Sequence, residues 1–68
     1  MRIRLQFQHL VSGSVFNSTE IDLTEEEVGT MKEALKKPSH FSFTTETGIE
    51  VYFGEEVLKQ GVTSIEYV

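Results

Sequence analysis

The residues with the most versatile side chains are two histidines, which could act as general bases or metal ligands. His9 ends an alternating N-terminal run, and His40 follows Pro38 and Ser39. Neither histidine has a partner at the spacing of a metal site or a catalytic triad, so we expect no catalytic role for either. Instead, we expect His9 to lie opposite Asn17 as a hydrogen-bonded pair, and His40 to be exposed.

The five glycines do not form a phosphate-binding loop, because neither GxGxxG nor GxxxxGK followed by serine or threonine occurs. Four of them mark turns. Gly29 lies inside a predicted helix, where it costs about 1 kcal/mol relative to alanine. The chain has no cysteine, which excludes a disulfide and a thiolate metal site. The sequence therefore predicts no cofactor, no metal site and no enzyme activity.

The densest charge feature is an acidic run with two interpretations. In the first, the carboxylates imitate nucleic acid and occupy the binding surface of a DNA-binding protein. In the second, they cap a helix and keep the protein in solution, since acidic side chains are favoured at helix N-termini. We favour the second interpretation, because the segment from Thr24 to Glu27 has the pattern of a helix cap. The run consists of Glu20, Asp22, Glu25, Glu26 and Glu27.

The length of 68 residues predicts one small domain, residues 1–68, with a thin margin of stability. Forming a homodimer is one way to add buried area. The net charge of −5 argues against nucleic acid as a partner. No basic-then-apolar signal segment precedes the first strand, and no apolar run approaches membrane-spanning length. We therefore expect a cytoplasmic protein without membrane contact.

Residues 2–11 alternate between apolar and polar side chains, which predicts a strand with one buried face. A turn at 12–14 would join it to a second strand and place Arg4 opposite Asp22 as a charge pair. The same register places Leu10 opposite Phe16 on the otherwise polar outer face. An isolated exposed pair is normal, but an aromatic beside an aliphatic residue is also typical of interface cores. We therefore predict a protein contact surface centred on Leu10 and Phe16.

The segment FSFTTETGIEVYF, residues 41–53, predicts a second hairpin. A two-residue loop would mix apolar and polar residues on both faces, whereas a three-residue loop at 46–48 separates them. The three-residue loop sets Phe43 opposite Val51 and Phe41 opposite Phe53, with glycine at the left-handed third position. Tyr52 then points outward, and we include it in the predicted protein interface.

Between the hairpins, residues 24–37 predict one amphipathic helix. Thr24 and Glu27 form a capping box, and Pro38 is expected to end the helix. The sequence thus predicts an α+β fold, ββα followed by further strands, in which one antiparallel sheet of four to five strands carries the helix on one face. The apolar stripe of the helix consists of Val28, Met31 and Leu35.

The C-terminal part predicts a single helical turn, with Val57 and Leu58 tucked under it, and then a final strand. Two facings of that strand are consistent with its sequence. Its inward residues are either Ile65 with Tyr67 or Val62 with Val68.

The ending VYFGEEVLKQGVTSIEYV resembles the ends of small uncharacterised phage and prophage proteins, over about the last quarter of the chain. The resemblance implies a mobile-element protein and no particular activity. The leading functional hypothesis is a small non-enzymatic interaction or regulatory protein, either homodimeric or bound to another protein. The alternative is an acidic inhibitor that mimics nucleic acid.

Overall fold

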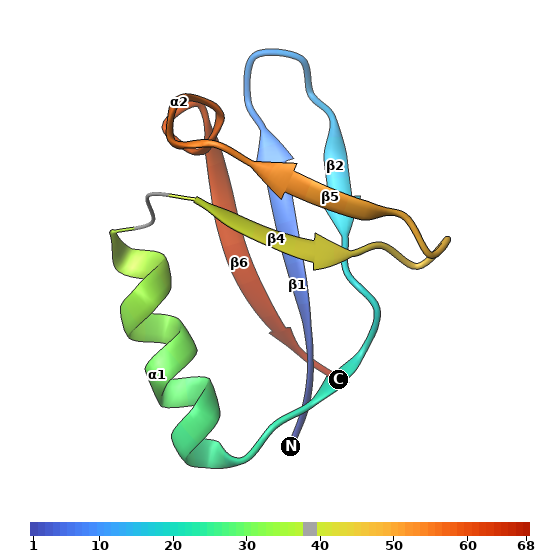
Figure 1. The fold of residues 1–68 in the computed structure, drawn as a ribbon, viewed down its shortest axis with the longest axis vertical. Coiled ribbons are helices and arrows are strands. Elements are labelled where there is room, and N and C mark those ends of the chain that lie inside the picture. The colour runs from blue at the N-terminus through green and yellow to red at the C-terminus, as the bar shows by residue number, and fades with distance from the viewer. Residues whose placement is uncertain (38–39) are drawn as a thin grey trace.

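The computed structural model describes residues 1–37 and 40–68, and it confirms the predicted α+β fold with one main helix (Figure 1). No helix in the described ranges is long and apolar enough to cross a membrane. The elements in chain order are β1 (Arg2–His9), β2 (Val15–Asn17), β3 (Ile21–Asp22), α1 (Glu25–Lys36), β4 (Phe41–Thr44), β5 (Glu50–Phe53), α2 (Glu55–Leu58) and β6 (Gly61–Tyr67).

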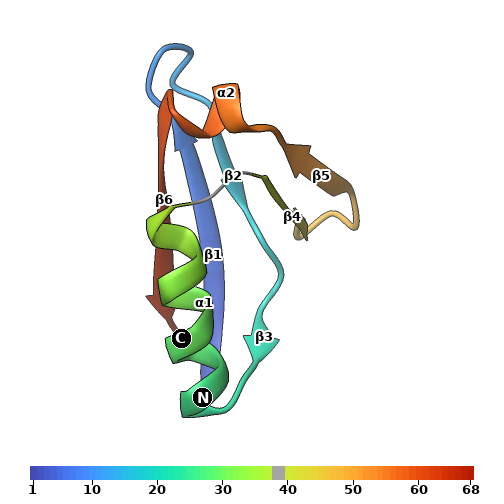
Figure 2. The same cartoon turned by 60° about the vertical axis from the view of Figure 1, so that its left-hand side comes forward.

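The strands divide between a four-stranded sheet and a separate two-stranded sheet. β1 is central in the first: β6 pairs antiparallel along one edge, and β2 and β3 share the other edge. The β4–β5 hairpin forms the second sheet and contacts the first through an isolated bridge between Ser18 and Thr45. Figure 2 shows α1 and this hairpin on the same side of the four-stranded sheet. The predicted strands are therefore present but do not all belong to one sheet.

The core lies between the inner face of β1 and the elements that cover it. Ile3, Leu5 and Phe7 are each at most 4% exposed. Burial of such side chains stabilises a fold by roughly 2 kcal/mol each. They pack with residues from α1, the second hairpin and α2: Val28, Phe43, Phe53 and Leu58.

Local sequence determines the start of α1 as predicted. The Thr24 hydroxyl accepts a hydrogen bond from the Glu27 amide (3.1 Å), and the Glu27 carboxylate accepts one from the Thr24 amide (2.9 Å). Val28 is buried, and Met31 and Leu35 pack against the core as the predicted stripe. The helix ends at Lys36. The prediction about Pro38 lies outside the described residues.

The predicted register of the first hairpin is wrong. The structure pairs Phe7 with Phe16 and Gln8 with Val15, so Phe16 does not lie opposite Leu10. The connecting loop has four residues, 10–13, closed by a hydrogen bond from the His9 amide to the Ser14 carbonyl (2.8 Å). This register turns Phe16 inward, where its ring lies 5.6 Å from that of Phe53. Added aromatic burial explains why the longer loop is preferred.

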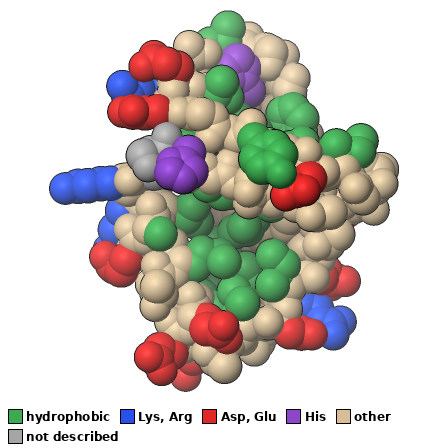
Figure 3. Space-filling model, viewed as in Figure 1, with side chains coloured by type: hydrophobic (Ala, Val, Ile, Leu, Met, Phe, Trp, Pro, Cys, Tyr) green, Lys and Arg blue, Asp and Glu red, His purple; other side chains and the backbone are tan. Residues whose placement is uncertain are grey.

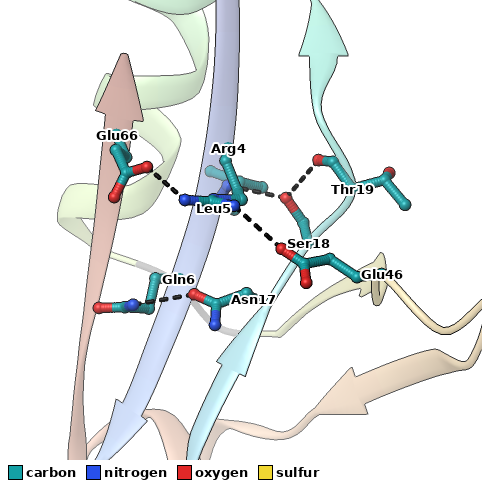
Figure 4. A network of polar contacts seen from close by, with 8 residues as sticks. All are labelled: Arg4, Leu5, Gln6, Asn17, Ser18, Thr19, Glu46 and Glu66. Atoms are coloured by element: carbon teal, nitrogen blue, oxygen red, sulfur yellow. Dashed lines mark hydrogen bonds and ion pairs between the residues drawn. The ribbon is translucent and has the colours of Figure 1, made fainter. Parts of the chain in front are cut away.

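A bulge after β2 then changes which residues face the core (Figure 4). Ser18 is fully buried opposite Leu5, and its hydroxyl replaces a backbone group as the hydrogen-bond acceptor of the Leu5 amide. That oxygen accepts from the Leu5 amide and donates to the Thr19 carbonyl, both at 2.8 Å. Because Thr19 and Glu20 together span one partner position, the inward phase shifts by one residue before Ile21.

The predicted charge pair between Arg4 and Asp22 is also wrong, because the bulge shifts the register. Asp22 lies opposite Arg2 rather than Arg4, and the two side chains form an ion pair at 3.1 Å. Arg4 instead bridges Glu46 at 3.0 Å and Glu66 at 2.5 Å across the outer face (Figure 4). Because these pairs are exposed, each contributes little to stability.

The predicted register of the second hairpin is confirmed. Phe41 pairs with Phe53 and Phe43 with Val51, and Gly48 has a φ of 85° in the left-handed region. Only glycine adopts this conformation without strain, so the loop length is encoded locally. Ile49, at the end of the apolar face, is nevertheless 59% exposed.

In the C-terminal part, the structure selects the first of the two strand facings. Leu5 pairs with Ile65 and Ile3 with Tyr67, so the odd-numbered residues of β6 face inward. In α2, Leu58 is buried as predicted, but Val57 is 41% exposed.

Candidate functional site

An apolar pocket of about 400 Å³ lies between the β1–β2 loop and the β5–α2 segment. We call it the aromatic pocket. Most of its lining is aromatic or aliphatic, and three polar residues from β1 and the following loop complete it. The lining consists of Phe7, Phe16, Val51, Tyr52, Phe53 and Val57, with His9, Ser12 and Ser14.

The rings on the inner side of the pocket belong to the core. The ring of Phe53 lies 4.7 Å from that of Phe7 and 5.6 Å from that of Phe16, the latter edge to face. Tilted and edge-to-face contacts of this kind are favourable for aromatic rings. The inner side of the pocket is thus formed by packed rings, and Phe16 is part of it because the first hairpin turns this residue inward.

Tyr52 forms the exposed edge of the pocket. Its side chain is 73% exposed, although it is adjacent in sequence to buried Phe53. Glu50 lies on the same face of β5, and its carboxylate raises the pKa of the Tyr52 phenol through a hydrogen bond, with burial a smaller cause. Tyr52 is therefore neutral at physiological pH and can present both an aromatic ring and a hydroxyl to a ligand.

His9 fixes the polar side of the pocket. Its Nδ1 lies 2.7 Å from the Ser12 hydroxyl, and its Nε2 lies 2.9 Å from the Gln60 side-chain oxygen. The predicted pairing of His9 with Asn17 is wrong, because Asn17 accepts a hydrogen bond from Gln6. Both ring nitrogens hold the loop against the segment before β6, and these two polar partners, rather than a carboxylate, orient the ring.

The structure brings together two of the three predicted interface residues, Phe16 and Tyr52, in one pocket. Leu10 is 62% exposed on the loop that also carries Ser12; it does not line the pocket and does not lie opposite Phe16. The sequence did not indicate that Val57 and His9 line this pocket. The signal that could have found the pocket is the change of apolar phase between Phe16 and Ile21.

The acidic run is spread over several elements. Asp22 pairs with Arg2, and the hydrogen bond from Arg2 lowers the pKa of Asp22. Glu27 accepts the capping hydrogen bond from the Thr24 backbone, which lowers the pKa of Glu27. Glu26 and Glu27 also border a hollow of about 630 Å³ beside α1. Figure 3 shows apolar side chains exposed beside α1, below the β4–β5 hairpin in this view.

Among the described residues, no group of three or more acidic or histidine side chains could hold a metal ion. No family model, curated protein or solved structure matches the chain.

Proposed function

We propose that the protein is a small non-enzymatic interaction protein that recognises a protein partner through the aromatic pocket and its rim. The observation that carries the proposal is Tyr52, an aromatic ring 73% exposed at the edge of an apolar pocket. Exposed tyrosines beside packed aromatic rings are typical centres of protein interfaces. Val57 also lines the pocket and is 41% exposed, and Leu10 is exposed on the loop that carries Ser12 of the lining. A cytoplasmic location and a phage or mobile-element origin belong to the same proposal; the C-terminal resemblance supports the origin.

Site-specific photo-crosslinking in the source cell tests this proposal. A photoreactive phenylalanine analogue replaces Tyr52 in one variant and Glu33 in the control. Glu33 is exposed on α1 and does not line the pocket. We expect a discrete protein adduct from position 52 that is absent from position 33. An adduct of twice the chain mass would identify a homodimer, and equal or absent labelling at both positions would contradict the proposal.

The acidic mimic is a second candidate, favoured by one observation. The hollow beside α1 combines Leu23, Met31 and Ala34 with the carboxylates of Glu26 and Glu27, so it fits a basic surface. The two candidates differ in salt dependence. Binding by a mimic weakens steeply as salt rises, whereas binding by the aromatic pocket changes little. Once crosslinking has identified the partner, its reversible binding to the unmodified protein, measured at several salt concentrations, separates them.

A further inference from the structure

The open edge of the four-stranded sheet is a second surface with defined chemistry. Among the described strands, β6 pairs only with β1. The Val68 amide donates to the Arg2 carbonyl, and the Leu10 amide donates to the Gln60 carbonyl, each at 3.0 Å. Hydrogen-bonded and non-hydrogen-bonded pairs alternate in an antiparallel ladder. The even-numbered residues of β6 therefore face β1, and the odd-numbered ones direct their N–H and C=O groups to the open edge.

The side chains of the same odd-numbered residues border a groove. Figures 1 and 2 show α1 running alongside β6. A space of about 400 Å³ lies between the two elements, and we call it the edge groove. A strand added to the open edge would direct alternate side chains into this groove. The groove is lined by Lys32, Leu35 and Lys36 from α1 and by Thr63, Ile65 and Tyr67 from β6.

The charge of the groove is opposite to that of the chain. The net charge is −5, yet the helical wall carries Lys32 and Lys36, and the ammonium of Lys36 also forms an exposed ion pair with Glu33 at 2.9 Å. The Lys32 ammonium lies 5.3 Å from the ring centroid of Tyr67, which holds it over the β6 side of the groove. Leu35 and Ile65 provide an apolar surface beside these charges. In Figure 3, basic side chains project on the left side of the molecule, where α1 lies.

We propose that the edge groove binds an extended peptide segment of a partner protein, which adds a strand to β6 and places acidic and apolar side chains beneath α1. The backbone groups of β6 require an extended partner, and the two lysines select carboxylates. A second copy of β6 fits less well, because its inward residues include no carboxylate and Glu66 lies on the outer face. The edge groove shares no lining residue with the aromatic pocket, so this proposal and the proposed function can fail separately.

A synthetic strand tests the proposal directly. The probe is the capped nonapeptide Thr-Val-Thr-Glu-Thr-Glu-Thr-Val-Thr, fluorescently labelled, whose alternate residues supply valine and glutamate to the groove. Two control peptides carry lysine in place of glutamate, or N-methyl groups on both glutamate amides. We expect saturable binding of the probe by fluorescence anisotropy and about tenfold weaker binding, or more, of each control, since charge and backbone hydrogen bonds are removed separately.

Protein variants locate the binding to β6 and α1. Thr63→Pro removes an outward N–H without touching the β1 ladder, so it should abolish binding in a folded protein. Lys32→Glu with Lys36→Glu should reverse the order of affinity, so that the lysine peptide binds more tightly than the glutamate peptide. This double variant also locates the binding to the groove if the proline variant does not fold. Lys37→Glu with Lys59→Glu makes the same change of net charge outside the groove and should leave the order unchanged.

Three outcomes would overturn the proposal. The first is no saturable binding of the probe. The second is binding that N-methylation and the groove variants leave unchanged, which would indicate unspecific attraction. The third is a dimer in sedimentation experiments that Thr63→Pro converts to monomer, because the occupant of the edge would then be a second copy of the chain.

Discussion

The aromatic pocket and the edge groove offer a partner different chemistry. The pocket is lined mainly by aromatic and aliphatic side chains, and its most exposed member is Tyr52. The groove combines the backbone groups of one strand edge with two lysines. A pocket of the first kind selects by shape and apolar contact, whereas a groove of the second kind selects an extended backbone and a charge. The two surfaces share no lining residue, so a chain of 68 residues presents two chemically different surfaces.

The two surfaces nevertheless depend on one packed core. Gly61 begins β6, and a Cβ atom at this position would lie 2.5 Å from the ring of Phe7, which lines the aromatic pocket. The start of β6, which lines the edge groove, therefore packs directly against the Phe7 ring, which lines the aromatic pocket. Variants in the core should disable both surfaces, and variants at the rims should disable one.

The largest effect is expected for Phe53→Ala. The ring of Phe53 contacts those of Phe7, Phe16 and Phe41 at centroid distances of 4.7, 5.6 and 5.3 Å. Its removal should destabilise the protein by about 3–5 kcal/mol, enough to unfold a domain of this size. Circular dichroism during denaturant titration measures this loss. Tyr52→Ala, one residue away but exposed, should leave the midpoint nearly unchanged, and equal effects would contradict the assignment of core and rim.

A smaller effect is expected for Gly61→Ala. The added methyl group would lie well inside van der Waals contact with the Gln8 carbonyl oxygen, so the start of β6 must shift. We expect a loss of about 1–3 kcal/mol, as for other overpacked sites, together with weaker peptide binding at the edge groove. Gly29→Ala is the matched control, because nothing beyond its chain neighbours and the adjacent backbone of α1 lies within 4 Å of the place that its methyl group would occupy. It should stabilise the protein by up to about 1 kcal/mol. Two equal midpoints in thermal unfolding would contradict this contrast.

Thr24→Ala tests whether the helical wall of the groove depends on its cap. The variant loses the hydrogen bond that the Thr24 hydroxyl accepts from the Glu27 amide. We expect a loss of about 1 kcal/mol in the free energy of unfolding, with an intact aromatic pocket. Thr24→Ser, which keeps the hydroxyl, should retain most of the stability. An unchanged denaturant midpoint for the alanine variant would show that the cap does not stabilise α1.

The smallest effect is expected from acidification. The pKa values of Asp22 and Glu27 are lowered in the folded protein by hydrogen bonds from Arg2 and from the Thr24 backbone. Depressed carboxylate pKa values stabilise the folded state above the unfolded pKa, and this contribution is lost as pH falls through the folded values. Stability should therefore decline below about pH 4. Denaturant midpoints between pH 7 and pH 3 measure the decline, and Asp22→Asn with Glu27→Gln should flatten it.

Several features of the fold follow from sequence alone because the atoms that specify them are close along the chain. The capping box of α1 joins Thr24 to a residue three positions later. The second hairpin follows from Gly48 and from alternating side chains on both sides of its loop. Tyr52 could be placed outward for the same reason. Short loops and local hydrogen bonds leave few alternatives, so these predictions did not require knowledge of the remaining chain.

Only the tertiary structure decided the first hairpin, the sheet order and hence the lining of both the aromatic pocket and the edge groove. Phe16 faces inward because Phe53, far along the chain, offers a ring to pack against, and the bulge at Ser18 restores the inward phase for Ile21. β6 lies beside β1 because its inward residues extend the same buried face, which leaves its other edge open. Local alternation specifies which side chains are apolar, but the choice among registers and neighbours depends on contacts formed only after distant segments pack together.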